Sequence, residues 1–188
     1  MWQADFTYFK VIGWAWYYLS TILDDYSRYI ISWKLCTNMR ASDVTETIDL
    51  ALTASGCDHA VVRHKLRFLS DNGSCYISSD VAEWLEDQKM DSVRGGPLHP
   101  QTLGKIELRH QDLKNRVLLE NYYLPGDFQR QIGAFVDYYS NQRYHESLTH
   151  VTPADVDFGR DKAILRDRKR IKRQAIKRRR VQHQKRAA

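Results

Sequence analysis

Residues 2–9 read Trp2-Gln3-Ala4-Asp5-Phe6-Thr7-Tyr8-Phe9, a run of apolar and aromatic residues that contains one carboxylate. This composition predicts a β-strand over residues 3–10, and its apolar flanks predict a central place in a sheet. A charged side chain in such a strand costs free energy unless it is paired or binds a metal ion. Asp5 is therefore the first candidate functional residue.

The order of the segments around this strand predicts one α/β domain. Two further strands, 17–24 and 29–35, flank the short polar stretch 25–28, which is typical of an antiparallel hairpin. Helical and strand patterns then alternate, which favours a mixed sheet with helices on both faces. We expect a helix over 43–55 capped by Ser42, a strand over 66–70, a helix from Ser78 or Ser79 to about Gln88, a strand over 91–94, a loop over 95–104, a helix over 104–121 and another amphipathic helix that ends near Tyr139.

The charge is divided unevenly between a body and a tail. Residues 160–188 hold 14 Lys or Arg and 2 Asp, a net charge of +12, whereas residues 1–159 hold 15 Lys or Arg and 21 Asp or Glu, a net charge of −6. A basic tail of this kind neutralises phosphates and steers association with nucleic acid. A solvated, disordered tail is the alternative. The tail has no Gly or Pro and could form a helix, but its charge density argues against a stable isolated one.

Cysteine usage and hydropathy bear on the compartment. Cys36, Cys57 and Cys75 are scattered and odd in number, which argues against a disulfide framework and favours a reducing compartment. The N-terminus lacks a basic region followed by an apolar run, and the longest apolar stretches have strand length. We therefore expect a cytoplasmic protein with no signal peptide and no membrane partner.

Two more carboxylates occupy special local settings. Asp71 follows the strand over 66–70 and opens a turn at Asn72-Gly73, while Glu107 lies in the first turn of the helix that begins at 104. Each residue also has a structural explanation: turn chemistry accounts for Asp71, and a favourable interaction with the helix dipole accounts for Glu107. Three carboxylates gathered in a fold would repel one another and need a cation. Oxygen-only ligands suit Mg²⁺ or Mn²⁺, which indicates metal-assisted chemistry on phosphates.

The helix that carries Glu107 has two stripes. Its apolar stripe of Ile106, Leu113 and Val117 predicts a core-facing side, and its polar stripe consists of Glu107, Gln111 and Lys114. From spacing alone, Lys114 is as readily an ordinary exposed lysine as a functional one.

Other clusters invite weaker interpretations. Cys57, His59 and His64 suggest zinc, but their spacing is not that of a zinc site. Asp24-Asp25 is interpreted as a turn. The aromatic residues Trp14, Trp16, Tyr17, Tyr18 and Trp33 are more typical of a sheet core and subunit contact than of base stacking.

Several ordered segments together resemble a known family. They are Trp2–Tyr8, Asp24–Arg28, Leu69–Gly73, His99–Glu107, Tyr138–Leu148 and Thr152–Asp155, with 35 residues between Asp71 and Glu107. They resemble the integrase-core DDE transposases of bacterial insertion sequences, and in particular the third insertion-sequence family, which is related to retroviral integrases. The resemblance covers about residues 2–160.

The resemblance implies a ribonuclease H-like fold with a mixed five-stranded sheet, over residues 1–159, followed by the basic tail at 160–188. It implies a two-metal site held by Asp5, Asp71 and Glu107, and a polynucleotidyl transferase that cleaves DNA and joins a 3′-hydroxyl to a target strand. Its partners would be transposon ends, target DNA and further copies of the chain, near the bacterial nucleoid. The candidate DNA contacts are Lys105, Gln111, Lys114, Arg168, Lys169, Arg170, Lys172, Arg173, Lys177, Arg178, Arg179 and Arg180.

Alternatives to this function stay open. One is a nuclease of the same fold that does not join strands; another is a non-catalytic DNA-binding remnant. Relatives carry helix-turn-helix segments upstream, and Met1 falls four residues before Asp5. We therefore expect a catalytic domain, a fragment of a larger product or a remnant. The loop with Gly95, Gly96 and Gly104 suits a lid that orders on DNA.

Overall fold

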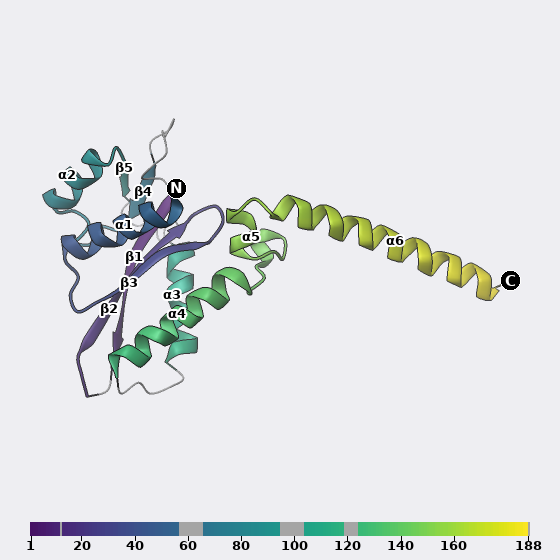
Figure 1. The fold of residues 1–188 in the computed structure, drawn as a ribbon, viewed down its shortest axis with the longest axis horizontal. Helices are drawn as coiled ribbons and strands as arrows, with labels where there is room; N and C mark the ends of the chain where they lie inside the picture. The colour runs from purple at the N-terminus through teal and green to yellow at the C-terminus, as the bar shows by residue number, and fades with distance from the viewer. Residues whose placement is uncertain (12, 57–65, 95–103, 119–123, 188) are drawn as a thin grey trace.

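A five-stranded mixed sheet forms the centre of the molecule (Figure 1). The structure, a computed structural model, describes residues 1–11, 13–56, 66–94, 104–118 and 124–187. The strand order is β3-β2-β1-β4-β5, so β1 is central, as its apolar flanks predict. β1 is antiparallel to β2 and parallel to β4. The strand bounds are β1 (Trp2–Lys10), β2 (Trp16–Asp24), β3 (Ile30–Cys36), β4 (Arg67–Ser70) and β5 (Asp91–Arg94).

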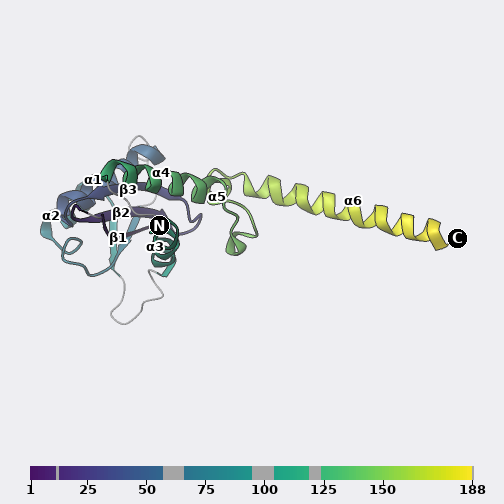
Figure 2. The same ribbon diagram turned by 90° about the horizontal axis from the view of Figure 1, so that it is seen from below.

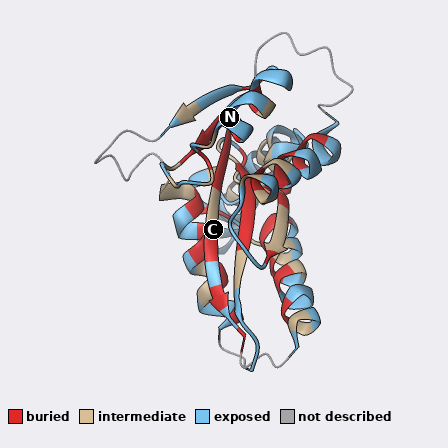
Figure 3. Ribbon diagram, turned by 90° about the vertical axis from the view of Figure 1, so that its left-hand side faces the viewer, coloured by how far each residue is buried: buried red, intermediate tan, exposed pale blue. Residues whose placement is uncertain are grey.

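Helices cover both faces of the sheet and bury two separate cores. One core takes side chains from α1 (Ala41–Ser55) and α2 (Ser79–Asp87), and the other from α3 (Gly104–Val117) and α4 (Pro125–Asn141). Figure 3 shows buried residues on the central strands and on the helix faces that pack against them. The predicted layers and all five predicted strands are confirmed.

Side-chain alternation along β1 decides which face each residue meets. Trp2 and Ala4 belong to the core of α1 and α2, whereas Phe9 and Val11 belong to the core of α3 and α4. Successive side chains of a strand point to opposite faces. Asp5 therefore lies on the face that α3 covers.

Two local expectations were wrong. α1 begins at Ala41 with Arg40 as its N-cap, so Ser42 is not the cap. Trp14 and Trp16 are 60% and 49% exposed and do not belong to the core. The reason is their position, because Trp14 lies beyond the strands and Trp16 pairs with Lys10 at the last rung of the hairpin. The predicted cap at Ser78 is confirmed.

The segment after α4 folds back onto the hairpin turn. A 3-10 helix (Glu146–Leu148) leads to α5 (Pro153–Asp157), which Thr152 caps through a capping box with Asp155. The Ser27 hydroxyl donates to Asp157 Oδ1 at 2.9 Å, and the rings of Tyr29 and Phe158 meet edge to face at 5.6 Å. The end of α5 and the residue after it thus hold this segment against the β2–β3 turn.

The basic tail forms α6 (Asp161–Ala187), a helix of 27 residues that projects from the body (Figures 1 and 2). The tail is thus helical, which its lack of Gly and Pro allows. Lys, Arg, Gln and Ala are strong helix formers. The body also holds the helix, because Arg168 Nη1 donates to the carbonyl of His150 at 2.7 Å. Among the described residues, no helix has both the length and the apolar character needed to cross a membrane.

Candidate active site

The parallel register of β1 and β4 makes Asp5 and Asp71 neighbours. Gln3 pairs with Leu69. Asp5 lies two residues after Gln3, and Asp71 lies two residues after Leu69, just beyond the end of β4 at Ser70. Paired strands run about 4.8 Å apart, and residues in register share a face. Asp71 therefore emerges at the carboxyl end of β4, beside Asp5 and on the α3 side of the sheet.

A tight turn orients the Asp71 carboxylate. Its Oδ1 accepts a hydrogen bond from the Gly73 backbone N–H at 2.9 Å. A Cβ atom on Gly73 would stand only 2.9 Å from that same oxygen. Glycine at this position therefore allows the close approach that holds the carboxylate.

Asp5 contacts a histidine on α3. Its Oδ2 lies 3.2 Å from Nδ1 of His110, whose side chain is almost completely buried. The Asp5 side chain is 20% exposed to solvent. Sequence reasoning missed His110, although the signal was present: it lies three residues after Glu107, and residues at that spacing share a helix face.

Glu107 stands on a third segment, the helix α3. It lies in the first turn of α3 and is exposed. Residues one helical turn apart have Cβ atoms about 5–6 Å from each other, so Glu107 neighbours the histidine that touches Asp5. Within residues 1–11, 13–56, 66–94, 104–118 and 124–187, however, no three His, Cys, Asp or Glu side chains lie together as a ready-made metal site. Joint coordination of one ion by Asp5, Asp71 and Glu107 stays a prediction.

The chemistry of the donors nevertheless fits a divalent cation. Tyr76 is buried, and burial together with the nearby Asp5 carboxylate raises its pKa well above the usual range, with Asp71 adding to the effect. Burial and the Asp71 carboxylate likewise raise the pKa of the Cys75 thiol. Both neighbours therefore stay protonated, and the carboxylates are the negative donors at this edge. Hard oxygen donors of this kind suit Mg²⁺ or Mn²⁺.

Lys105 is engaged within the protein. Its Nζ lies 2.8 Å from Asp25 Oδ1 and donates to the Asp25 carbonyl at 3.0 Å. Gln3 donates to the same Asp25 carboxylate at 2.7 Å. This network fastens the start of α3 to the β2–β3 turn. Asp24 accepts from the backbone N–H groups of Tyr26 and Ser27, which confirms the turn interpretation of the acidic pair.

The rest of the polar stripe runs along β1. Gln111 is exposed, and Lys114 Nζ lies 4.4 Å from the centre of the Tyr8 ring. The apolar stripe of Ile106, Leu113 and Val117 is buried, as predicted.

A partly buried ionic cluster ties α3 to the segment after α4. Asp112 Oδ2 accepts from Arg109 Nη1 at 3.0 Å and from Arg143 Nη1 at 2.8 Å. The ring of His145 packs edge to face on Tyr139 and is buried. Burial and the nearby guanidinium groups of Arg109 and Arg143 lower the pKa of His145 to about 4. His145 is thus a neutral residue that packs in the interior.

A family comparison decides what this arrangement belongs to. The model of the family described as "Integrase core domain" matches residues 1–100, more than half of the chain. The chain belongs to the integrase core domain family. The matched residues of this integrase core domain include Asp5 and Asp71 and end before Glu107.

Curated relatives extend the similarity beyond residue 100. The transposase for insertion sequence element IS629 of Shigella sonnei is 28% identical over 159 residues, which are 84% of this chain and 51% of the relative. The transposase for insertion sequence element IS904 of Lactococcus lactis subsp. lactis (strain IL1403) is 24% identical over 159 residues, 84% of this chain and 60% of the relative. The integrase core domain thus spans about half to three fifths of the length of these relatives.

Solved structures share the fold. One chain of the simian T-cell lymphotropic virus intasome, in complex with the PP2A regulatory subunit B56 gamma, gives a TM-score of 0.70 at 19% identity over 83% of this chain and 53% of that chain. The HTLV-2 integrase catalytic core domain in complex with magnesium gives 0.65 at 18% identity over 83% and 94%. The predicted ribonuclease H-like fold is confirmed.

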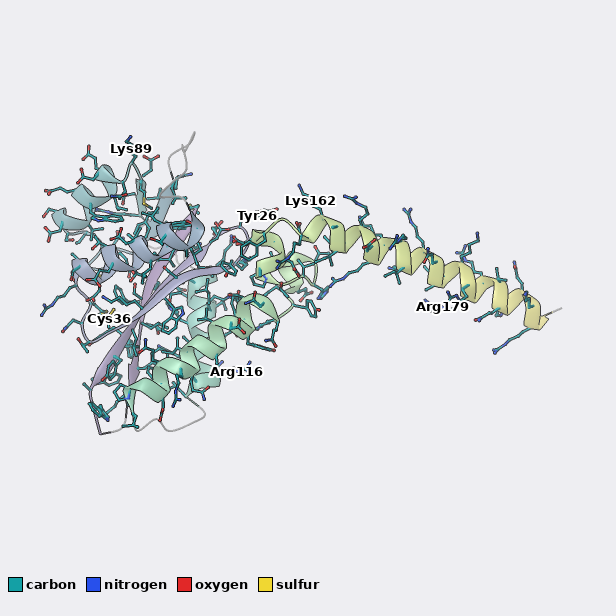
Figure 4. All side chains as sticks on the ribbon, viewed as in Figure 1. Tyr26, Cys36, Lys89, Arg116, Lys162 and Arg179 are labelled. Atoms are coloured by element: carbon teal, nitrogen blue, oxygen red, sulfur yellow. The ribbon has the colours of Figure 1, made fainter. Side chains whose placement is uncertain are left out.

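The predicted DNA contacts of the tail lie on α6. Arg168 donates to the main chain of the body and Arg170 pairs with Asp167 at 3.1 Å. Lys162 and Arg179 extend away from the helix (Figure 4). The remaining predicted contacts are exposed: Lys169, Lys172, Arg173, Lys177, Arg178, Arg179 and Arg180.

Some expectations fall outside the part of the chain that the structure describes. These are the zinc alternative at Cys57, His59 and His64, and the proposed lid at Gly95 and Gly96. Within the described part, Cys36 and Cys75 are free thiols.

Proposed function

We propose that this integrase core domain cleaves DNA strands and joins them to a target, using Mg²⁺ or Mn²⁺ held by Asp5, Asp71 and Glu107. The observation that supports it most is the β1–β4 register, which makes Asp5 and Asp71 neighbours on the face that α3 covers. The names of two relatives, which are transposases, support the same reaction class.

Each aspartate keeps one oxygen available for a cation. His110 contacts Oδ2 of Asp5, and the Gly73 N–H holds Oδ1 of Asp71. The other oxygen of each carboxylate has no protein partner among the described residues. The protein therefore orients both carboxylates and leaves one donor atom of each unused. Glu107 is exposed on α3 and would supply the third carboxylate.

The proposed reaction has two steps. Water attacks a phosphodiester and releases a 3′-hydroxyl, and this hydroxyl then attacks a phosphodiester of the target strand and displaces its 3′-oxygen. Divalent ions bound by the three carboxylates would supply Lewis-acid activation of the attacking and leaving oxygens. No side chain needs to act as a covalent nucleophile. His110 and Gly73 contribute by orienting the carboxylates.

The basic helix α6 supplies the proposed contact with duplex DNA. Its cationic side chains surround the helix and do not gather on one side, and no acid follows Asp167. A helix lying in the major groove has phosphates on both sides, which suits charges all around. Removal of residues 160–188 should therefore flatten the salt dependence of duplex binding, since each neutralised phosphate contributes about 0.9 to the logarithmic slope. We also propose that the chain acts as a homo-oligomer on paired DNA ends.

A strand-transfer assay with a pre-cleaved donor end tests the reaction. Glu107→Gln should keep DNA binding and lower turnover about 10³-fold or more, which is ~4 kcal/mol of transition-state stabilisation. Glu83→Gln, at an exposed position on α2, is the matched control and should leave turnover unchanged. Cleavage without joining would indicate a nuclease. DNA binding without any metal-dependent turnover in the native chain would contradict the proposal.

A further inference from the structure

Exposed aromatic side chains gather at the end of the β1–β2 hairpin. Tyr8 and Trp16 are 58% and 49% exposed, and their rings meet edge to face at 5.6 Å. Trp14, two residues before Trp16 in the turn, is 60% exposed. Figure 1 shows this turn at the end of β1 remote from the N-terminus. We call Tyr8, Trp14 and Trp16 the aromatic platform. Exposed apolar groups in this number mark an interaction site.

Two lysines lie on the aromatic platform. Lys10 Nζ is 5.9 Å from the centre of the Trp16 ring, and Lys114 Nζ is 4.4 Å from the centre of the Tyr8 ring. Residues 6–23 contain Lys10 and no acid, although residues 1–159 as a whole carry a net charge of −6. The platform is thus a cationic, aromatic surface on an otherwise acidic body, and its charge complements a polyanion.

We propose that the aromatic platform stacks the unpaired bases of single-stranded DNA while Lys10 and Lys114 contact the flanking phosphates. Aromatic rings interleaved with cations are the feature by which proteins hold single strands without reading their sequence. Tyr8 follows Asp5 by three residues, about 10 Å along β1, so its side chain starts on the opposite face of the sheet from Asp5. Lys114 of α3 nevertheless reaches the Tyr8 ring at 4.4 Å, which links the platform to the helix that carries Glu107. The inference rests on the proposed function, because it assigns the platform to the unpaired end of the DNA that the site would process.

A second copy of the chain fits the platform less well. In a twofold contact between identical surfaces, each residue of the patch faces the same patch of the partner. Lys10 and Lys114 of both copies would then be crowded together, which like charges oppose. Single-stranded DNA meets the same lysines with phosphates.

Intrinsic tryptophan fluorescence of the full chain tests the proposal. The probe is an oligothymidylate titrated in EDTA, so that binding is measured without metal or turnover. We expect the oligonucleotide to quench the fluorescence. The double variant Tyr8→Ala, Trp16→Ala should weaken single-strand affinity, followed by anisotropy of a labelled oligothymidylate, by roughly 10-fold or more. Duplex binding through α6 should change little.

The controls separate stacking from folding and from charge. Tyr26→Ala removes an exposed ring (74%) beyond the other end of β2 and should leave single-strand affinity unchanged. Lys10→Gln should lower the logarithmic salt slope of single-strand binding by about 0.7. Trp16→Phe retains a ring and should keep most of the affinity, and the thermal unfolding of every variant checks the fold.

Several results would overturn the proposal. One is unchanged oligothymidylate affinity in the folded double variant. If affinity is unchanged but the sedimentation coefficient is altered, the platform is a subunit contact. If affinity is unchanged but binding to anionic vesicles is lost, the platform is a membrane-binding surface. Because binding is measured without metal, an inactive chain that still loses affinity in the double variant would contradict the proposed function and leave this inference standing.

Discussion

The Nδ1 atom of His110 lies 3.2 Å from Oδ2 of Asp5. This contact joins a helix on one face of the sheet to the carboxylate in its central strand, across 105 residues of sequence. It fixes how α3 sits along β1, and therefore where Glu107, one turn earlier, stands relative to Asp5. Partners of metal ligands orient those ligands, and their loss commonly lowers metal affinity or activity 10- to 100-fold.

His110 is accordingly predicted to be a positioning residue. His110→Ala should raise the Mg²⁺ concentration needed for half-maximal strand transfer by about 10-fold or more, with the KM for DNA little changed. His110→Gln, which can still hydrogen-bond Asp5, should recover part of the loss. Leu108→Ala, at an exposed position of the same helix, serves as the control. An unmoved Mg²⁺ midpoint in a folded His110→Ala protein would limit the histidine to packing.

Gly73→Ala should separate activity from stability. A Cβ there would stand 2.9 Å from Asp71 Oδ1, and that carboxylate can swing away because it ends a flexible side chain. We expect turnover to fall at least about 10-fold, by loss of ligand orientation. The free energy of unfolding should change by less than about 1 kcal/mol.

Gly126→Ala is the control for this variant, since nothing lies within 4 Å of its added Cβ and it should alter neither quantity. Full activity of Gly73→Ala would show that the Asp71 turn does not orient a ligand.

Asp112 should be a major determinant of stability. It is the carboxylate that holds both Arg109, which is 8% exposed, and Arg143. Asp112→Asn leaves a buried guanidinium without its counter-charge, so we expect urea denaturation to show a loss of about 3 kcal/mol. Asp127→Asn breaks the exposed ion pair with Arg130 and should cost less than about 1 kcal/mol. Equal losses in the two variants would contradict the role of the Asp112 cluster.

The pH dependence of stability should carry the signature of His145. Its pKa is lowered in the folded protein from 6.5 to about 4, by burial and by the nearby arginines. Between these values the unfolded chain binds a proton that the folded chain resists. This contribution is therefore complete above pH 6.5 and is lost as the pH falls toward 4, at about 1.4 kcal/mol for each unit.

Urea denaturation across pH 4–7 measures this slope. His145→Asn should flatten it, whereas His150→Asn, at an exposed residue with a φ of 59°, should keep it. An identical slope in His145→Asn would assign the pH dependence to other groups.

Much of the fold follows from local patterns in the sequence. The apolar flanks of Asp5 predict a central strand, the apolar stripe of α3 predicts its buried face, and Ser78 predicts the start of α2. Each of these signals is contained within one element, where strand alternation, helical periodicity and capping act.

Buried polar residues were harder to predict. Arg109 and His110 are buried on α3 because their partners, Asp112 and Asp5, accompany them. The spacing of apolar residues cannot predict the burial of a polar side chain, because that burial depends on a partner distant in the sequence. The exposure of Trp16 was missed for a related reason, since composition predicts a strand and does not tell which of its rungs lies beyond the helices.

Anomalous diffraction from a crystal soaked in Mn²⁺ tests most directly whether three carboxylates share a metal. The prediction is a peak about 2.1 Å from oxygens of Asp5 and Asp71, with Glu107 joining the coordination in the presence of donor-end DNA. A fully soaked crystal with no peak at these residues, or with Mn²⁺ bound elsewhere and none at Asp5 and Asp71, would contradict it.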